Sequence, residues 1–375
     1  MLRYTTSGES HGKCLTVILE GMVAGLKISQ KGIDAELSRR QKGYGRGGRM
    51  LIETDVADIT SGVRFDETIG SPIAMVMVNR DFKINDLPVV LRPRPGHADL
   101  AGAIKYNRSD VRDILERASA RETTARVAMG AVCRQFLMEF GIDILSHVVD
   151  IGGVKADVDT MSFDQIRKIA EPDPVRCADA AASKMMIKKI DAIKKAKDTV
   201  GGIFEIRVKG LPPGLGGFTH YDARIDARLS YALMSIQAIK GVEIGLGFAH
   251  AYVPGSGSHD EIFYQSKAKE FYRKTNRSGG IEGSMTTGSE LVLRAVAKPY
   301  ATLMKPMQST NIKTKKKEVG TIERSDVTAV PACGVVGESM VAFELAKTFL
   351  EKFGGDSLHE TRRNYKQYLK QAREF

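Results

Sequence analysis

The sequence predicts an α+β fold in a single large domain. Candidate strands and helices are interspersed along its 375 residues without the regular βαβ rhythm of a doubly wound sheet. The chain contains no clean linker and no short-period repeat, although its length could hold two or three domains. We therefore expect one domain over 1–375, ending in a basic helical tail at about 357–375.

Hydrophobic periodicity and β-branched residues predict the elements in order. Thr16, Val17 and Ile18 favour a strand near the N-terminus, and apolar alternation favours another at 203–208. Strands are expected at 15–19, 51–54, 73–79, 148–154, 203–208 and 291–297. Helices are expected at 33–41, 163–170, 178–196, 224–239 and 339–353, followed by the tail.

The stretch 92–126 begins with a stiff turn that carries one histidine. Pro93 and Pro95 fix their own φ, and each restricts the arginine before it. The backbone around His97 is therefore expected to be largely set before any ligand binds.

A helix is expected to follow this turn. Ser109 and Asp110 are good N-cap residues, and apolar spacing continues the helix to Phe140. Arg117 and Arg121 are four residues apart, so this helix would place both on one face. They would form either a cationic platform beside His97 or an ordinary solvated helix surface.

The segment 8–12, GESHG, is expected to form a tight turn that presents His11 to a ligand. It also matches the G-x-S-x-G nucleophile elbow. That motif needs a strand before it and a helix after it. Because a strand follows here, we disfavour a serine hydrolase.

The segment 39–50, RRQKGYGRGGRM, combines glycines with arginines. It formally contains G-x-G-x-x-G, but a dinucleotide fingerprint should follow a strand, and this one follows a helix. An RGG-like RNA-binding segment is a second interpretation. A basic loop that closes over an anion fits better, because Arg40, Arg46 and Arg49 can each bind carboxylate or phosphate through two hydrogen bonds.

The composition indicates an anionic partner. The formal net charge is +11, which favours either a nucleic acid or a small polyanion. Tryptophan is absent, which disfavours single-strand binding by base stacking. The four cysteines match no metal or disulfide spacing, so we expect reduced thiols and a cytoplasmic protein. We expect no signal peptide and no membrane contact.

Arginine-rich loops and two glycine-flanked histidines together indicate a substrate with several negative charges. Departure of phosphate needs a proton or a cation on the leaving oxygen, and histidine can supply a proton near neutral pH. The sequence has neither a P-loop nor a metal-ligand cluster. The residues alone therefore indicate an enzyme that acts on a small phosphorylated, carboxylated compound.

Taken together, the motifs of this chain resemble those of chorismate synthases, in the family's order and over nearly the whole length. The matching segments are GESHG at 8–12, RRQKGYGRGGRM at 39–50, RPGHAD at 94–99, RASARETTARVA at 117–128, QAIKGVEIG at 237–245, a glycine segment at 279–288 and RSDVTAVPACGVVGE at 324–338. The resemblance implies a β-α-β sandwich with helices packed between antiparallel sheets.

The resemblance also implies a carbon–oxygen lyase of the shikimate pathway. Its reaction is an anti 1,4-elimination of phosphate from 5-enolpyruvylshikimate-3-phosphate, giving chorismate. It needs reduced FMN, although no net redox change occurs. The family further implies a homotetramer. NADPH or an external flavin reductase would supply the reduced cofactor.

Carried over by motif, three residues would perform acid–base chemistry. His11 would protonate the leaving phosphate, His97 would manage protonation at the flavin's pyrimidine edge, and Asp326 would assist removal of the ring hydrogen. The arginines that would bind the substrate are Arg40, Arg46, Arg49, Arg94, Arg121 and Arg324. The residues that match FMN contacts are Arg117, Ala118, Ser119, Gln237, Ala238, Gly283, Lys298, Pro299, Tyr300, Ala301, Thr302 and Arg324, and Arg40 and Arg46 would also serve NADPH.

Two segments depart from the family's commoner pattern. RAS replaces RSS, so Ala118 can offer only a backbone contact, and KPYAT replaces KPTSS, which leaves side-chain contacts from Tyr300 and Ala301 in doubt. Two other function classes remain open. A basic nucleic-acid-binding protein predicts salt-sensitive RNA affinity, and an NAD(P)H flavin reductase predicts flavin turnover without any shikimate-derived substrate.

Overall fold

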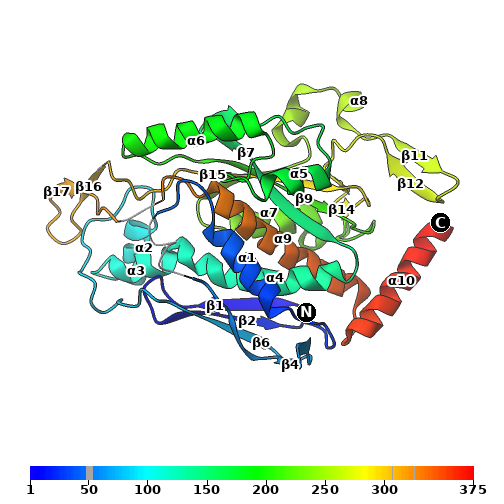
Figure 1. The fold of residues 1–375 in the computed structure, drawn as a ribbon, viewed down its shortest axis with the longest axis horizontal. Helices are drawn as coiled ribbons and strands as arrows, with labels where there is room; N and C mark the ends of the chain where they lie inside the picture. The colour runs from blue at the N-terminus through cyan, green and yellow to red at the C-terminus, as the bar shows by residue number, and fades with distance from the viewer. Residues whose placement is uncertain (48–53, 306, 324–325) are drawn as a thin grey trace.

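The computed structural model describes residues 1–47, 54–305, 307–323 and 326–375. Two antiparallel sheets enclose a layer of helices (Figure 1). The smaller sheet has the order β1 (Arg3–Ser7), β2 (Cys14–Glu20), β6 (Ile73–Val78) and β3 (Asp58–Ser61). The larger sheet has the order β10 (Ile239–Ile244), β15 (Leu291–Ala297), β9 (Gly202–Lys209), β7 (Asp143–Ile151) and β8 (Val154–Lys155).

The helices between the sheets are α1 (Gln30–Gln41), α4 (Thr123–Met138), α7 (Ile225–Met234) and α9 (Val330–Phe353) (Figure 1). Beyond the larger sheet, on the side away from α4, lie α5 (Phe163–Ala170) and α6 (Ala180–Lys195). The shorter elements are β4 (Val63–Arg64), β5 (Glu67–Thr68), η2 (Ala120–Glu122), η3 (Tyr221–Ala223), η4 (Gly247–Tyr252), α8 (Gly255–Ser258), β13 (Ile281–Glu282), β14 (Met285–Thr286), β16 (Gln308–Thr310) and β17 (Lys317–Val319). The predicted sandwich of helices between antiparallel sheets is confirmed.

Strand alternation explains why the sheets face the helix layer. In β2 the side chains of Leu15, Val17 and Leu19 are fully buried, whereas Ile18 is exposed. Such a period of two turns one face of a sheet toward the core. The predicted strand 291–297 and helix 163–170 match β15 and α5 residue for residue. The predicted strand 51–54 falls mostly on residues that are not described.

The helix predicted from Ser109 to Phe140 is interrupted, so that prediction was wrong. Helix α3 (Arg112–Ala118) ends before Ser119, whose backbone is extended (φ −62°, ψ 139°). The Ser119 hydroxyl accepts a hydrogen bond from the Arg121 N–H at 3.3 Å and starts the short η2 turn. Serine favours such local bonds at helix starts over helix interiors. Arg117 and Arg121 therefore share no helix face.

Helix α9 begins at Val330, nine residues before the predicted start, so its glycines are helical. Pro331 lies in the first turn, where a missing N–H costs nothing. Gly337 faces the larger sheet, and a Cβ there would meet Ile206 Cδ1 at 2.8 Å. Gly337 is therefore needed for the close packing of α9 against the larger sheet. The helix predicted at 224–239 and the strand predicted at 148–154 were also misplaced, because α7 ends at Met234 and β7 begins at Asp143.

A small hydrophobic cluster lies apart from the main core, at the end of the molecule that carries α2 (Asp99–Tyr106) and α3. It consists of Val90, Ala103, Val111 and Leu115. This α2–α3 cluster packs the two short helices against each other. His97 lies just before α2, so the cluster supports the turn that carries this histidine.

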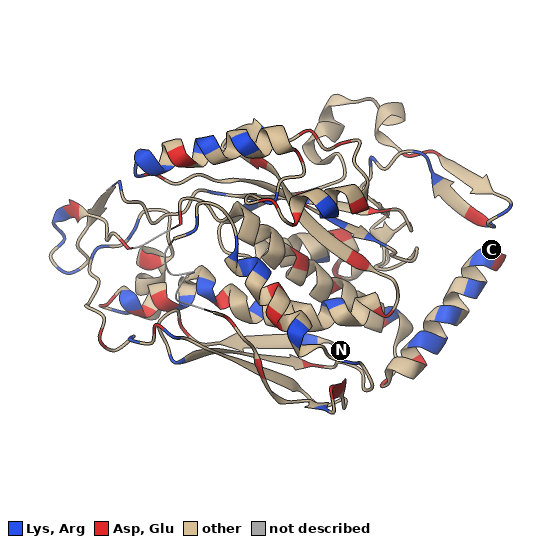
Figure 2. Ribbon diagram, viewed as in Figure 1, with Lys and Arg blue, Asp and Glu red and all other residues tan. Residues whose placement is uncertain are grey.

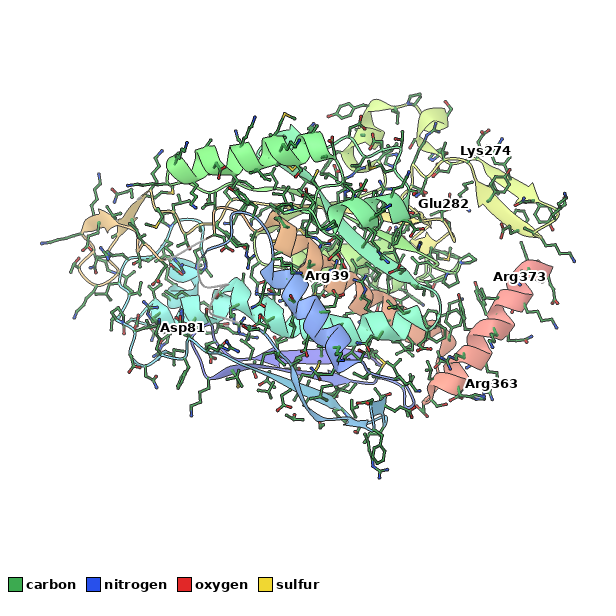
Figure 3. All side chains as sticks on the ribbon, in the orientation of Figure 1. Arg39, Asp81, Lys274, Glu282, Arg363 and Arg373 are labelled. Carbon is green, nitrogen blue, oxygen red and sulfur yellow. The ribbon has the colours of Figure 1, made fainter. Side chains whose placement is uncertain are left out.

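A buried ionic network around Glu338 of α9 joins the helix layer to the larger sheet. Its carboxylate lies 2.8 Å from Arg39 Nη1, 2.5 Å from Arg134 Nη1 and 3.3 Å from Arg176 Nη2. It also accepts a hydrogen bond from Ser146 Oγ at 2.6 Å. Burial would raise the pKa of Glu338, but the charges of Arg39 and Arg134 and their hydrogen bonds hold it well below its usual value. Arg39, labelled in Figure 3, links α1 to α9 through this network.

We expect Glu338→Ala to lower the free energy of unfolding by about 3–5 kcal/mol, because it leaves several buried guanidinium groups without their shared partner. Denaturant unfolding followed by circular dichroism measures this change. The control is Glu351→Ala on the same helix, which removes a half-exposed partner of Arg228 and should cost at most about 1 kcal/mol. Equal losses in the two variants would contradict a special role for the network.

The C-terminal helix α10 (Leu358–Glu374) and the hairpin of β11 (Ile262–Gln265) and β12 (Glu270–Arg273) project from the body at the end opposite α2 (Figure 1). Lys and Arg residues recur along the α10 ribbon (Figure 2). That residues 1–375 form a single domain stays a prediction. Within the described ranges, no helix has the combined length and hydropathy required to cross a bilayer.

Candidate active site

A cavity of about 750 Å³ opens beside the N-terminal end of α9. Its walls come from segments that are far apart in the sequence. They are the turn at 10–11, the end of α1, the turn at 94–98, α3 with η2, and the segments 236–238 and 298–302, together with the first turns of α9. Both candidate histidines and the third acid–base candidate, Asp326, line it. The structure therefore brings together the three residues that the resemblance assigned to proton transfer.

The turn that carries His11 is fixed by a glycine and by a buried glutamate. Gly8 has φ +102°, and a Cβ there would lie 2.2 Å from the Cys14 carbonyl oxygen, so only glycine fits. The Glu116 carboxylate accepts a hydrogen bond from the His11 backbone N–H at 2.8 Å, and both of its oxygens lie 3.0 Å from His11 Nδ1. His11 Nε2 lies 3.7 Å from Asp81 Oδ2.

The second histidine is part of a buried ionic group. His97 Nδ1 lies 2.5 Å from Asp99 Oδ1, and Arg94 Nε donates to Asp99 Oδ2 at 2.8 Å. Burial would raise the pKa of Asp99, but the hydrogen bonds from His97 and Arg94 and the charge of Arg94 hold it well below its usual value. Gly96 supplies a φ of +76° in this turn. The turn is thus fixed by ionic contacts as well as by the two prolines.

Two arginines of the cavity lining, Arg40 and Arg121, contact the buried carboxylate of Asp55. Arg121 Nη1 lies 2.6 Å from Asp55 Oδ1, and Arg40 Nη1 lies 3.5 Å from Asp55 Oδ2. Arg40 Nη1 is buried and makes no hydrogen bond within the described part of the chain. Burial lowers the pKa of Arg40 to about 10, with Asp55 opposing this effect and Arg121 and Arg46 adding to it. The Asp55 carboxylate therefore offsets part of the cost of burying this charge.

Asp326 lines the cavity together with Arg46. Its carboxylate accepts a hydrogen bond from the Gly47 backbone N–H at 2.6 Å and lies 3.3 Å from Arg46 Nε. The loop after α1 is therefore tied to the segment before α9. Arg49 and Arg324, which were also predicted to bind the substrate, lie outside the described residues.

Most residues predicted to contact FMN line the same cavity. They are Ala118, Ser119, Gln237, Ala238, Lys298, Tyr300, Ala301 and Thr302. Lys298 Nζ donates to the Gly96 carbonyl oxygen at 2.5 Å, and Arg94 Nη1 donates to Thr302 Oγ1 at 3.0 Å, so this segment is joined to the His97 turn. Tyr300 fills space with a buried ring, and burial raises its pKa.

Three of the predicted contact residues are not in the cavity lining. Pro299 is absent from the wall that its neighbours form. Arg117 points to the N-terminal segment, where its guanidinium donates to the carbonyl oxygens of Gly8 and Thr6 at 2.8 and 2.9 Å. Gly283 forms the turn between β13 and β14, with φ +54°, ahead of β15, whereas Lys298 follows the other end of that strand. Their proposed contacts with FMN remain predictions.

Three acidic residues near the site were not predicted from the sequence. Glu116, Asp55 and Asp81 each lie within reach of a predicted site residue. Among the described residues, the ion-pair partners of the His11 ring are the carboxylates of Asp81 and Glu116. Asp99 could have been found from its position two residues after His97, but no local pattern marks Asp55, which is far from Arg121 in sequence.

Comparison with known proteins identifies the family. The family model "Chorismate synthase" matches residues 2–350. A chorismate synthase of Geobacter metallireducens is 54% identical, and one of Bacillus cytotoxicus is 50% identical, each covering 100% of both chains. A solved structure titled "Crystal Structure of Chorismate Synthase" superposes with a TM-score of 0.84 at 42% identity, over 100% of this chain and 99% of that one. This chain belongs to the chorismate synthase family.

Proposed function

We propose that this chain converts 5-enolpyruvylshikimate-3-phosphate to chorismate by anti 1,4-elimination of phosphate. The single observation that carries the proposal is the cavity in which His11, His97 and Asp326 meet buried arginines. Its chemistry suits a substrate with a phosphate and two carboxylates. Neither a nucleic-acid-binding protein nor a plain flavin reductase is supported by the family match.

The arginines bind and orient the substrate. Arg40 and Arg121 are held by Asp55 and by the helices around them, so their charge does not need to reorganise when an anion enters. Both arginines are almost fully buried, and a low-dielectric surrounding strengthens each charge–charge contact. Arg40 and Arg121 both line the cavity, so their guanidinium groups are placed to bind anionic groups of the substrate.

The residues present fit a reduced flavin. The cavity volume lies within the range for small-molecule sites. Gln237 donates through Nε2 to Glu122, while its buried Oε1 makes no hydrogen bond with any described residue. This acceptor suits an N–H group of a flavin ring, and Ala118 and Ala301 leave room for a flat ring nearby. When bound, reduced FMN supplies a transient electron that eases phosphate departure and is recovered as the ring hydrogen leaves.

The acid–base roles are those that the family resemblance implies, assigned to side chains that line the cavity. His11 gives a proton to the oxygen that departs with the phosphate, and this oxygen keeps the electron pair of the broken C–O bond. Asp326 assists removal of the ring hydrogen. His97, fixed by Asp99, holds a proton at the edge of the coenzyme site.

Further properties of the family are proposed here as well. NADPH near Arg40 and Arg46, or an external reductase, would reduce the flavin. A homotetramer would require exposed contact surfaces. The hairpin of β11 and β12 offers one, since Ile262, Tyr264 and Phe271 are all more than half exposed. Light scattering of the full chain tests the tetramer.

Anaerobic incubation with dithionite-reduced FMN and 5-enolpyruvylshikimate-3-phosphate is the decisive experiment. We expect release of inorganic phosphate together with the ultraviolet absorbance of a conjugated diene, and no product with oxidised FMN. If no inorganic phosphate is released under reducing conditions, the proposal is refuted. Reduction of oxidised FMN by NADPH in a separate mixture without the shikimate-derived substrate would instead indicate a flavin reductase.

A further inference from the structure

Glu116 lies directly beneath His11 and contacts it in several ways. Its side chain is only 1% exposed. The carboxylate contacts both the ring Nδ1, at 3.0 Å, and the backbone N–H of His11, at 2.8 Å. In addition, the Glu116 carbonyl oxygen accepts a hydrogen bond from the Ser10 N–H at 3.0 Å. One residue of α3 therefore fixes both the backbone of the His11 turn and the orientation of its ring.

The charge of Glu116 is itself well supported. Arg112, one helical turn earlier, places Nη1 3.3 Å from Glu116 Oε1. Burial would raise the pKa of Glu116, but the hydrogen bonds from the His11 ring and backbone, and the one from Arg112, keep it below its usual value. The group is thus an ionised carboxylate at neutral pH, and an ionised carboxylate can only accept hydrogen bonds.

This contact decides which ring nitrogen of His11 retains its proton. Nδ1 of His11 faces both carboxylate oxygens of Glu116, which can only accept hydrogen bonds, so Nδ1 must carry a hydrogen. Nε2 is then the ring nitrogen that exchanges a proton. The same arrangement, a carboxylate that orients a histidine and stabilises its cation, operates in hydrolytic triads. We infer that Glu116 is a positioning residue which keeps His11 in the Nδ1–H form and supports its protonated state, so that Nε2–H is the acid delivered to the departing phosphate.

This inference rests on the proposed function and deepens it. In the step, the C–O bond breaks with its electron pair on the phosphate oxygen, and the proton moves from Nε2 of His11 to that oxygen. Nδ1–H stays on the ring and Glu116 takes no proton. Solvent restores the proton at Nε2 after product leaves.

Other charged groups near His11 bear on its protonation. From α3 these are Glu116 and Arg112, and from the segment after β6 they are Asp81 and Lys83. Asp81 lies 3.7 Å from Nε2 and is engaged by Lys83 at 2.7 Å, so its charge is partly compensated. Figure 3 labels Asp81 near α3. Glu116 is nearer and more buried, so its removal should have the larger effect.

Glu116→Gln tests the inference, because it removes the charge and keeps the shape. We expect kcat for phosphate release at neutral pH to fall about 10–100-fold, with KM changed less than twofold. The alkaline limb of kcat against pH should move to lower pH, since the protonated ring loses its supporting anion. The control is Glu344→Gln, the same change in a buried glutamate of α9 that does not contact a histidine, which should leave both quantities unchanged.

A second measurement does not depend on activity. The chain has seven histidines, so ¹⁵N-histidine NMR, assigned with His11→Gln, can report the His11 tautomer in the free protein. The wild type should show the Nδ1–H form above the pH at which the ring loses its charge, and Glu116→Gln should populate Nε2–H.

The outcomes separate the two proposals. An active wild type with an unshifted pH profile in Glu116→Gln would overturn the positioning role, as would an Nε2–H ring in the wild type. A wild type that releases no phosphate would overturn the proposed function, while the NMR result would still decide whether Glu116 sets the tautomer.

Discussion

His11→Ala is expected to reduce kcat for phosphate release by about 10²–10⁴-fold while the fold stays intact. The rate falls because His11 is the proposed proton donor to the leaving phosphate. Among the described residues, no other proton donor in this part of the cavity is supported by a buried carboxylate as His11 is by Glu116. The fold should survive, because Glu116 keeps its hydrogen bonds to the residue-11 backbone N–H and to Arg112. Single-turnover phosphate release under anaerobic conditions measures the effect.

A matched control for this variant is His220→Ala, which removes an exposed histidine that does not line the cavity. It should leave kcat and the thermal midpoint unchanged. Full activity in His11→Ala, with an unchanged far-ultraviolet circular dichroism spectrum, would reject the assigned acid. A loss of folded protein would instead show that the turn needs the ring for stability.

His97→Ala is expected to cost about the same, 10²–10⁴-fold in rate. The reason differs, because His97 faces the site proposed for the coenzyme and is joined to Asp99 and Arg94. Arg94 and Asp99 remain paired in the variant, so the turn should keep its shape. We expect the rate to stay low even when the substrate and reduced FMN are both saturating.

Titration of reduced FMN into His97→Ala distinguishes binding from chemistry. If the rate of the variant returns to the wild-type value at high FMN concentration, His97 contributes only to the binding of the coenzyme. A variant as fast as the wild type at every FMN concentration would exclude any role in proton management.

Local patterns predicted the regular elements better than the site. Strand β15 and helix α5 have clear periodicity and clear ends, so their bounds were predicted from the sequence. The break at Ser119 was missed because its cause is a single side-chain hydrogen bond. The early start of α9 was missed because Gly337 is explained only by the sheet that packs against it.

The arginines of the site were recognisable as a class, but their partners were not. Arg40, Arg94 and Arg121 stand in ordinary-looking basic segments, and the family resemblance, not periodicity, assigned them to the substrate. Asp55 contacts Arg121 only because a loop after α1 folds against η2. Partnerships of this kind depend on the tertiary arrangement, which no local pattern encodes.

The α2–α3 cluster has a consequence for how the enzyme would fail. Asp99, the first residue of α2, fixes His97, and Glu116 of α3 fixes His11, yet these helices are packed together by a few side chains outside the main core. Both proton-handling groups therefore share one lightly anchored support. If heating unfolds α2 and α3 first, the positions of His11 and His97 are lost together. Catalytic activity should then disappear while the two sheets and the central helices are still folded.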